Sequence, residues 1–177
     1  MKRLFVYILF SVFFLCLFVP QLSAQTRQQD LELTVIAPIN TPEGERVISL
    51  DRYRRFHVLL TNISARSIRL WQSWNSWGYQ NMTLITNFGD GWATIRRQKP
   101  KHIDGDFPDF WVLEPGEYLV LEVDLSTAEW KGIPDLYDES QNAKMKVMFQ
   151  SPRDVLSEEF GIWTGNIESE EVKVVFK

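Results

Sequence analysis

Apolar and polar residues alternate with a period of two along much of this chain, and no other feature of the sequence restricts the fold as strongly. The alternation is clearest in the segments 31–36, 53–61, 118–125 and 143–150. Successive side chains of an extended strand point to opposite faces, so this pattern is typical of strands that bury one face. No segment keeps the periodicity of a helix. We therefore expect an all-β fold.

Turn residues separate these segments and indicate how the strands connect. Asp90-Gly91 favours a hairpin between residues 79–86 and 91–97. Residues 114–117 predict a tight turn, because Pro115 presets φ and Gly116 permits positive φ. The other expected segments are short strands at 46–50, 67–72, 110–113 and 172–176, and connections at 126–142 (with room for one helical turn) and 151–161. About nine short antiparallel strands indicate a single β-sandwich over residues 31–177.

The first 24 residues have the order of a secretory signal peptide. A positive head at Lys2 and Arg3 precedes an apolar run over residues 4–19, and Ala24 is small enough for the position before a cleavage site. The run holds 16 residues, fewer than the roughly 20 of a membrane-spanning helix, so a retained anchor is the weaker alternative. We expect a signal-peptide helix cleaved after Ala24, a flexible mature N-terminus over 25–30, and a secreted or periplasmic domain outside the membrane.

Cleavage would also remove the only cysteine of the chain. Cys16 lies in the apolar run, so the 153 residues after Ala24 contain none. Disulfides, thiolate zinc sites and a cysteine nucleophile are thereby excluded from the mature domain. All seven tryptophans lie in the mature part, and we expect a core rich in large aromatic residues.

Charge is distributed unevenly along the mature chain, which holds 17 Lys/Arg and 23 Asp/Glu. Residues 45–101 hold ten basic and three acidic residues, whereas residues 102–177 hold six and seventeen. A basic half can mark a site for a polyanion. In a sandwich, however, strands from both halves interleave and bring opposite charges together. We favour pairing between the halves and expect no nucleic-acid partner.

Three motifs stand at strand boundaries: Phe56-His-Val-Leu-Leu-Thr-Asn62-Ile-Ser64, Leu113-Glu-Pro-Gly-Glu117 before an alternating strand, and Ile162-Trp-Thr-Gly165 with Ser169 before the last strand. In these motifs the chain resembles a broad group of bacterial secreted immunoglobulin-like domains. That group is similar in fold to the BsuPI-type proteinase inhibitor domains. The resemblance covers most of residues 31–177 and implies an immunoglobulin-like sandwich. It assigns no inhibitory loop and no ligand.

The densest candidate for recognition is the segment Trp71-Gln-Ser-Trp74-Asn-Ser-Trp77-Gly-Tyr79. Exposed aromatic rings stack on the apolar faces of sugars and fill interfaces with proteins. The spacing of three would place the tryptophans on one side of a helical turn. Packing at the end of the sandwich core is the competing interpretation. The expected contact residues are Trp74, Trp77 and Tyr79, with a polar rim of Arg96, Arg97 and Lys101.

Other groups of reactive side chains give weaker signals. One loop holds four potential ligands for a metal ion: His102, Asp104, Asp106 and Asp109. Their spacing departs from the calcium-loop pattern and fits turn chemistry, so we expect no metal and no cofactor. Glu114 and Glu117 could act as a pair of catalytic carboxylates, but they flank a tight turn where exposed acids are ordinary. We expect no enzyme.

These observations favour a secreted, non-catalytic immunoglobulin-like module that binds a protein or a carbohydrate, or serves as an accessory surface domain. The alternative is a proteinase-inhibitor-like domain that presents an extended loop, residues 99–109, to a protease. A hydrolase using loop carboxylates is the third class. The exposure of Trp71, Trp74 and Trp77 tests the first hypothesis, which loses its main support if all three are buried.

Overall fold

The computed structural model describes a chain built mostly of strands, over residues 29–49, 54–88, 91–99, 107–133 and 143–175. The expected signal peptide, residues 1–24, and most of the N-terminal segment 25–30 lie outside the described residues. Across the described ranges, we find no helix with the length and apolar character that crossing a membrane requires.

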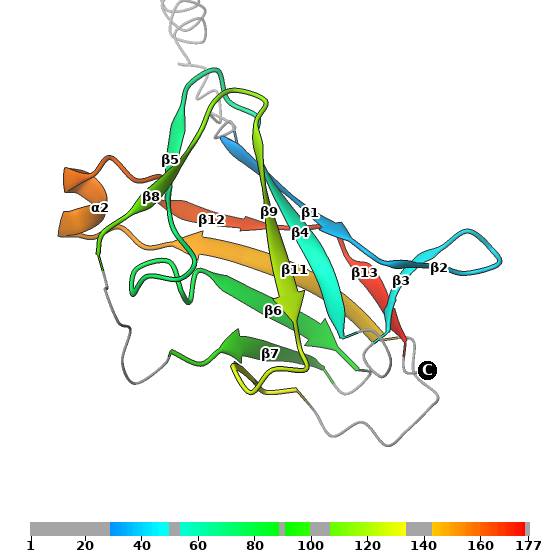
Figure 1. Cartoon of the computed structure of the whole chain (residues 1–177). Helices are drawn as coiled ribbons and strands as arrows, with labels where there is room; N and C mark the ends of the chain where they lie inside the picture. The colour runs from blue at the N-terminus through cyan, green and yellow to red at the C-terminus, as the bar shows by residue number, and fades with distance from the viewer. Residues whose placement is uncertain (1–28, 50–53, 89–90, 100–106, 134–142, 176–177) are drawn as a thin grey trace, which may run out of the picture.

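Two layers of strands face each other (Figure 1). The smaller layer consists of β1 (Leu31–Ile36), β4 (Arg55–Asn62) and β9 (Tyr118–Asp124). These strands form an antiparallel sheet in the order β1-β4-β9, so β4 is central and β1 and β9 are the edges. We call this layer the small sheet.

The larger layer contains eight strands, which are β2 (Ile39–Asn40), β3 (Arg46–Ser49), β6 (Met82–Asn87), β7 (Trp92–Arg97), β10 (Trp130–Lys131), β11 (Ala143–Ser151), β12 (Gly165–Glu168) and β13 (Val172–Val175). Their order is β10-β7-β6-β11-β13-β3-β2, and β12 also pairs with β11. We call this layer the large sheet. A separate ribbon, β5 (Ile68–Trp71) with β8 (Phe110–Leu113), lies at one end of the layers (Figure 1).

The all-β prediction is confirmed, and several elements lie where the sequence predicted them. β1 and β8 have the expected bounds, and β6 pairs with β7 in antiparallel fashion, as the hairpin prediction requires. Two details differ from the prediction. The described residues contain thirteen strands rather than about nine, because very short strands form where the sequence shows no alternation. In addition, β13 pairs with β3 in parallel.

The connection 151–161, expected to be a loop, contains the short helix α2 (Val155–Glu159). The Asp154 carboxylate accepts a hydrogen bond from the Ser157 backbone N–H at 2.7 Å. The Ser157 hydroxyl accepts one from the Asp154 N–H at 2.8 Å. This capping box satisfies two amides at the start of the helix. Of the connection 126–142, the described part holds turns and β10, and residues 134–142 lie outside the described residues.

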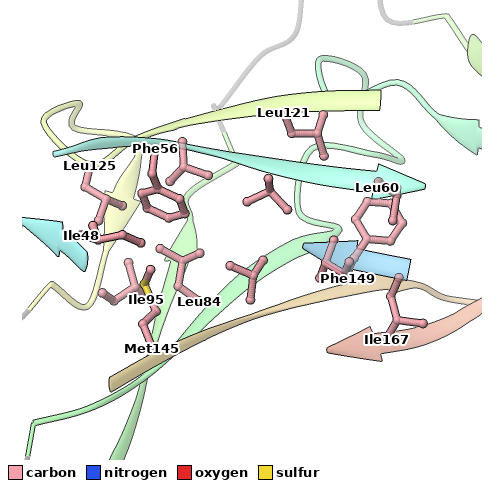
Figure 2. Packing of buried hydrophobic residues seen from close by; sticks show 14 of the residues in the cluster. Ile48, Phe56, Leu60, Leu84, Ile95, Leu121, Leu125, Met145, Phe149 and Ile167 are labelled. Atoms are coloured by element: carbon pink, nitrogen blue, oxygen red, sulfur yellow. The ribbon is translucent and has the colours of Figure 1, made fainter. Parts of the chain in front are cut away.

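Side chains from the inner faces of the two layers meet in one core (Figure 2). Phe56, Leu60 and Leu121 point inward from the small sheet toward residues of the large sheet that include Leu84 and Met145. Burying each such side chain stabilises the fold by about 1.5–3 kcal/mol. The expectation of a core rich in large aromatics is wrong, because only two of the seven tryptophans, Trp71 and Trp130, are buried. The core is mainly aliphatic, and two further indole rings, those of Trp111 and Trp163, are partly buried against it.

Asn62, at the end of β4, joins the small sheet to the ribbon of β5 and β8. Its side-chain nitrogen donates to the carbonyl oxygens of Arg66 at 2.7 Å and Leu113 at 2.8 Å. Its side-chain oxygen accepts from the Ser64 N–H at 2.9 Å and the Ser64 hydroxyl at 2.7 Å. Asn62 is fully buried, so these bonds fix the corner from which Trp71 and the neighbouring segment extend.

Candidate functional site

The tryptophan-rich segment 71–79 continues from β5 into a series of turns and forms no helix. Asn75 organises these turns. Its side-chain oxygen accepts hydrogen bonds from the N–H groups of Trp77 at 3.1 Å and Gly78 at 2.9 Å. Its side-chain nitrogen donates to the carbonyl oxygen of Asp109 at 2.7 Å. A buried asparagine therefore holds the segment to itself and to the residues that precede β8.

These turns separate the three tryptophans that a helical turn would have aligned. Trp71 is buried, and its ring centroid lies 5.6 Å from that of Trp77, which is partly buried. Trp74 is 58% exposed, and its ring meets Trp111 edge-on at 5.3 Å with an interplanar angle of 90°. Of the three tryptophans, Trp74 thus offers a broad exposed ring, and its neighbour Trp111 comes from a strand far along the chain.

Tyr79 and Arg97 form one stacked pair. Tyr79 is buried, and the guanidinium carbon of Arg97 lies 3.9 Å from the centre of its ring. Arg97 also donates to the Glu129 carboxylate at 3.1 Å and to the Ser73 carbonyl oxygen at 3.1 Å. Burial raises the pKa of the Tyr79 hydroxyl, although the positive charge of Arg97 acts in the opposite direction. The pair ties the tryptophan-rich segment to β7 and leaves Tyr79 little surface for a ligand.

The remaining predicted rim residues do not gather around Trp74. Arg96 is exposed on β7, but it precedes Arg97 directly, so the two side chains leave the strand on opposite faces. Lys101 lies outside the described residues, as do His102, Asp104 and Asp106 of the acidic loop. In the part of the chain that the structure describes, no cluster of three His, Cys, Asp or Glu side chains is arranged to hold a metal ion.

A groove of about 370 Å³ opens beside Trp74, on the side of the molecule where β9 ends the small sheet. Residues from both sheets and from the ribbon line it. The small sheet contributes Val120, Leu121, Glu122 and Asp124, all on β9. The opposite side includes Trp74, Met82, Arg97, Trp111, Glu129 and Trp130. We call this feature the β9 groove.

Carboxylates give the margin of the β9 groove its charge. Arg55 donates to Asp124 at 2.6 Å, and the same nitrogen lies 3.9 Å from Glu122. Hydrogen bonds from the hydroxyl and N–H of Ser126 hold the pKa of Asp124 below its ordinary value, and Arg55 adds to this effect. Glu122 and Glu129 keep about half of their side-chain surface exposed. The groove thus combines aromatic rings with an acidic rim.

The ion pairs also show how the uneven charge is arranged in space. Arg55 and Arg97 belong to the basic half of the sequence, and their partners Asp124 and Glu129 belong to the acidic half. A third pair joins Lys173 to Glu45 at 2.7 Å. Neighbouring strands therefore bring opposite charges together, as we favoured, and two of the basic side chains are engaged within the molecule.

Sequence reasoning identified Trp74 and missed most of the residues around it. Trp111, Glu122 and Glu129 belong to separate strands or connections, and nothing in their local sequence distinguishes them from ordinary strand or surface residues. They meet because β8 leads into β9, and because β10 follows Glu129 and pairs with β7. The sequence carries no local signal for this juxtaposition.

A second groove, of about 770 Å³, lies between β5 and the chain from Gly161 into β12. Its basic residues already have partners within the molecule. Arg66 forms an ion pair with Asp30 at 3.0 Å. Arg69 donates to the Phe160 carbonyl oxygen at 2.9 Å and stacks on Phe110 at 4.9 Å. These contacts connect the ribbon to neighbouring segments, and the groove offers no exposed aromatic ring comparable with Trp74.

The structure describes part of the loop expected for a proteinase inhibitor and both carboxylates expected for a hydrolase. Phe107, near the end of the loop 99–109, is 72% exposed, and residues 100–106 lie outside the described residues. The Glu117 carboxylate accepts from the Glu114 N–H at 2.9 Å, and Glu114 accepts from the Ser67 hydroxyl at 2.5 Å. Both carboxylates thus stabilise the turn and its corner.

Comparisons of the chain with family models, with curated proteins and with solved structures give no match. The proposals below therefore rest on the residues and the geometry of this molecule.

Proposed function

We propose that this chain is a secreted, non-catalytic binding module with an immunoglobulin-like sandwich, and that its recognition site is the β9 groove. The observation that carries the proposal is the position of Trp74. A 58% exposed indole stands at the rim of the groove and packs edge-on against a second indole, Trp111. Secretion is supported by the signal-like order of the first 24 residues.

The lining of the β9 groove suits a ligand with both apolar and polar surface. Its volume falls within the roughly 300–1,000 Å³ that is common for binding sites. Trp74 and Trp111 provide aromatic contact area on side chains with few rotatable bonds, which keeps the entropic cost of binding low. Arg97, Glu122 and Glu129 provide hydrogen-bonding groups at the margin. The candidate ligands are proteins and carbohydrates.

The electrostatics of Asp124 suit a structural role rather than that of a general acid. A general acid needs a carboxyl group whose pKa is raised by its surroundings. Asp124 shows the reverse, because Ser126 and Arg55 stabilise its ionised form. Its role in the proposed module is to hold Arg55 and the turn at the end of β9 in place.

Tryptophan fluorescence tests the proposal directly. The mature domain is titrated with a panel of soluble oligosaccharides and with a library of displayed peptides. A ligand of the β9 groove should shift the emission, and Trp74→Ala should weaken its binding at least about tenfold, equivalent to 1.4 kcal/mol.

Trp92 is the matched control, because it is 50% exposed but lies on β7 and does not line the groove. Trp92→Ala should bind the same ligand with unchanged affinity. Equal losses in both variants, or full binding by Trp74→Ala, would rule out the groove as the recognition site.

A proteinase-inhibitor-like role is a second candidate, favoured by one observation. Phe107 is 72% exposed beside a segment held by Asn75, whose side chain binds the Asp109 carbonyl oxygen at 2.7 Å. An exposed aromatic residue on a tethered loop suits the specificity pocket of a chymotrypsin-like protease. Inhibition that disappears in Phe107→Ala would support this role, and rapid cleavage near Phe107 without inhibition would exclude it.

A further inference from the structure

The backbone of β9 presents unused hydrogen-bonding groups along the β9 groove. The Glu117 carbonyl oxygen accepts from the Asn62 N–H at 2.9 Å, and the Leu125 N–H donates to the Arg54 carbonyl oxygen at 2.8 Å. In an antiparallel pair, hydrogen-bonded residues alternate with residues that face away from the partner strand. The register therefore directs the backbone groups of Leu119, Leu121 and Val123 toward β4, and those of Tyr118, Val120 and Glu122 away from it.

Nothing in the described part of the chain pairs with this outer side of β9. The strand is seven residues long. It ends the small sheet, as Figure 1 shows. Its sequence, Tyr-Leu-Val-Leu-Glu-Val-Asp, contains no proline and no lysine. Proline, lysine and very short length are the devices that usually keep an edge strand from pairing with another chain. The outer side chains Tyr118 and Val120 are exposed as well.

We propose that β9 receives an extended segment of a partner protein, which adds to the small sheet as a fourth strand. This inference rests on the proposed function, because it names the ligand class of the β9 groove. The backbone N–H and C=O groups of Val120 and Glu122 repeat with the spacing of a strand, and an extended polypeptide matches that spacing. Alternate side chains of the added strand enter the groove toward Trp74, Trp111 and Trp130.

The charge of the groove specifies the partner further. On the outer face, a side chain of the added strand lies next to Glu122, whose only ion-pair partner in the described residues is Arg55 at 3.9 Å. Glu129 adds a second half-exposed carboxylate on the opposite side of the groove. Opposite charges on neighbouring strands stabilise the pairing. The partner segment therefore alternates apolar side chains, which enter the groove, with Lys or Arg.

A second copy of this chain is a poorer occupant of the same edge. Pairing two β9 strands about a two-fold axis sets the same surface of each copy against the other. The acidic margin formed by Glu122 and Glu129 would then lie close to its own duplicate, and like charges oppose association. A basic segment from another protein avoids this repulsion.

The experiment selects displayed random peptides of about twelve residues on the mature domain and then measures the affinity of the enriched peptides for Val120→Pro. The Val120 N–H points to the groove side, so proline there removes one outward donor and leaves the bonds to β4 intact. Val120→Thr, which keeps the N–H, is the matched control. We expect enriched peptides to alternate apolar and basic residues, and to bind Val120→Pro at least about tenfold more weakly than Val120→Thr.

A chemical probe makes the test independent of the folding of any variant. The best peptide is resynthesised with N-methyl groups on alternate residues, which removes the backbone donors on one side of its strand. Two such peptides are made, one methylated on its odd residues and one on its even residues. One of the two should lose binding at least about tenfold, and the other should keep it. Equal binding of the two methylated peptides, or no enriched peptide at all, would overturn strand addition.

The outcomes also separate this inference from the proposed function. Oligosaccharide binding that Trp74→Ala abolishes, without any peptide binding, would keep the β9 groove as the recognition site and overturn the peptide as its ligand. Failure of both ligand classes would overturn both proposals. Light scattering measures the oligomeric state and tests the remaining occupant, a second copy of this chain. A wild-type dimer that Val120→Pro dissociates would assign the β9 edge to that second copy instead.

Discussion

The two sheets of this molecule end in different ways. The large sheet ends on β10 and β2, each of two residues, and on the four-residue β12, whereas the small sheet ends on β1 and β9, of six and seven residues. Short edge strands offer little backbone for another chain to pair with, and long ones offer much more. The exposed Trp74, its partly buried neighbour Trp111 and the acidic rim lie beside one of the long edges. The large sheet is therefore the closed scaffold, and the small sheet carries the surface open to partners.

The largest expected effect distinguishes the two sides of β9. Leu121→Pro removes an N–H that the register directs to β4 and disrupts a buried position, which should lower the free energy of unfolding by about 3 kcal/mol or more. Val120→Pro should lower it by less than about 1 kcal/mol, because the lost N–H faces the groove. Urea unfolding of the two variants measures the difference. Equal losses in the free energy of unfolding would show that the backbone on both sides of β9 is hydrogen-bonded within the molecule. The small sheet would then have no open edge at β9, in contrast to what we infer.

Asn62→Ala should give the next largest effect, because this residue fixes the end of the small sheet to the ribbon. The change leaves the Leu113 carbonyl oxygen without its 2.8 Å donor and Ser64 without its acceptor in a buried corner. We expect a loss of about 2–3 kcal/mol in the free energy of unfolding. Ser64→Ala is the control and should cost less than about 1 kcal/mol, since Asn62 keeps its bonds to backbone carbonyls. If the two variants have the same free energy of unfolding, the hydrogen bonds of Asn62 do not stabilise the junction between the small sheet and the ribbon.

A smaller effect concerns the aromatic pair at the groove. Trp74 and Trp111 meet edge-on at 5.3 Å, and such pairs contribute about 0.5–1.5 kcal/mol beyond the area they bury. A double-mutant cycle of Trp74→Ala and Trp111→Ala, followed by thermal unfolding, measures this coupling. A coupling energy near zero would mean that the two rings do not form a joint wall of the groove.

The smallest effect is a dependence on pH from Tyr79, on the large-sheet side of the groove. Burial raises the pKa of its hydroxyl above 10.0, so the folded state favours the neutral form. The resulting stability is complete below the unfolded pKa and is lost as the pH rises through the folded pKa. Tyr79→Phe should therefore lose less stability than the wild type as the pH rises above about 10, as measured by urea midpoints. A parallel decline in both proteins would contradict the burial of this hydroxyl.

The sequence predicted the elements whose shape depends on one buried face. β1 has the expected bounds, because alternation states directly which residues enter the core, and β8 has them because a tight turn follows Leu113. Helix α2 was missed because five residues are too few to show a helical period, and its only local signal is the pair Asp154 and Ser157. β12 was missed for a similar reason, since Ile167 is its only buried residue.

The candidate site was predictable only in part. Trp74 stands out by composition, but its orientation depends on the turns held by Asn75 and on Gly78. A Cβ at Gly78 would lie 2.2 Å from the Gln72 carbonyl oxygen, so the chain folds back on itself more tightly than other residues allow. The groove partners Trp111 and Glu122 depend on long-range strand pairing, which no local pattern encodes.

The parallel pairing of β13 with β3 has a consequence for the timing of assembly. Val47 lies opposite Lys173, so β3 can join the large sheet only after residues far along the chain have been made. β2 pairs only with β3 among the described residues and joins after it. Contacts between such distant residues slow folding. The large sheet is therefore complete only once β13 is in place, and a protein truncated before Val172 would lack three strands of that sheet rather than one.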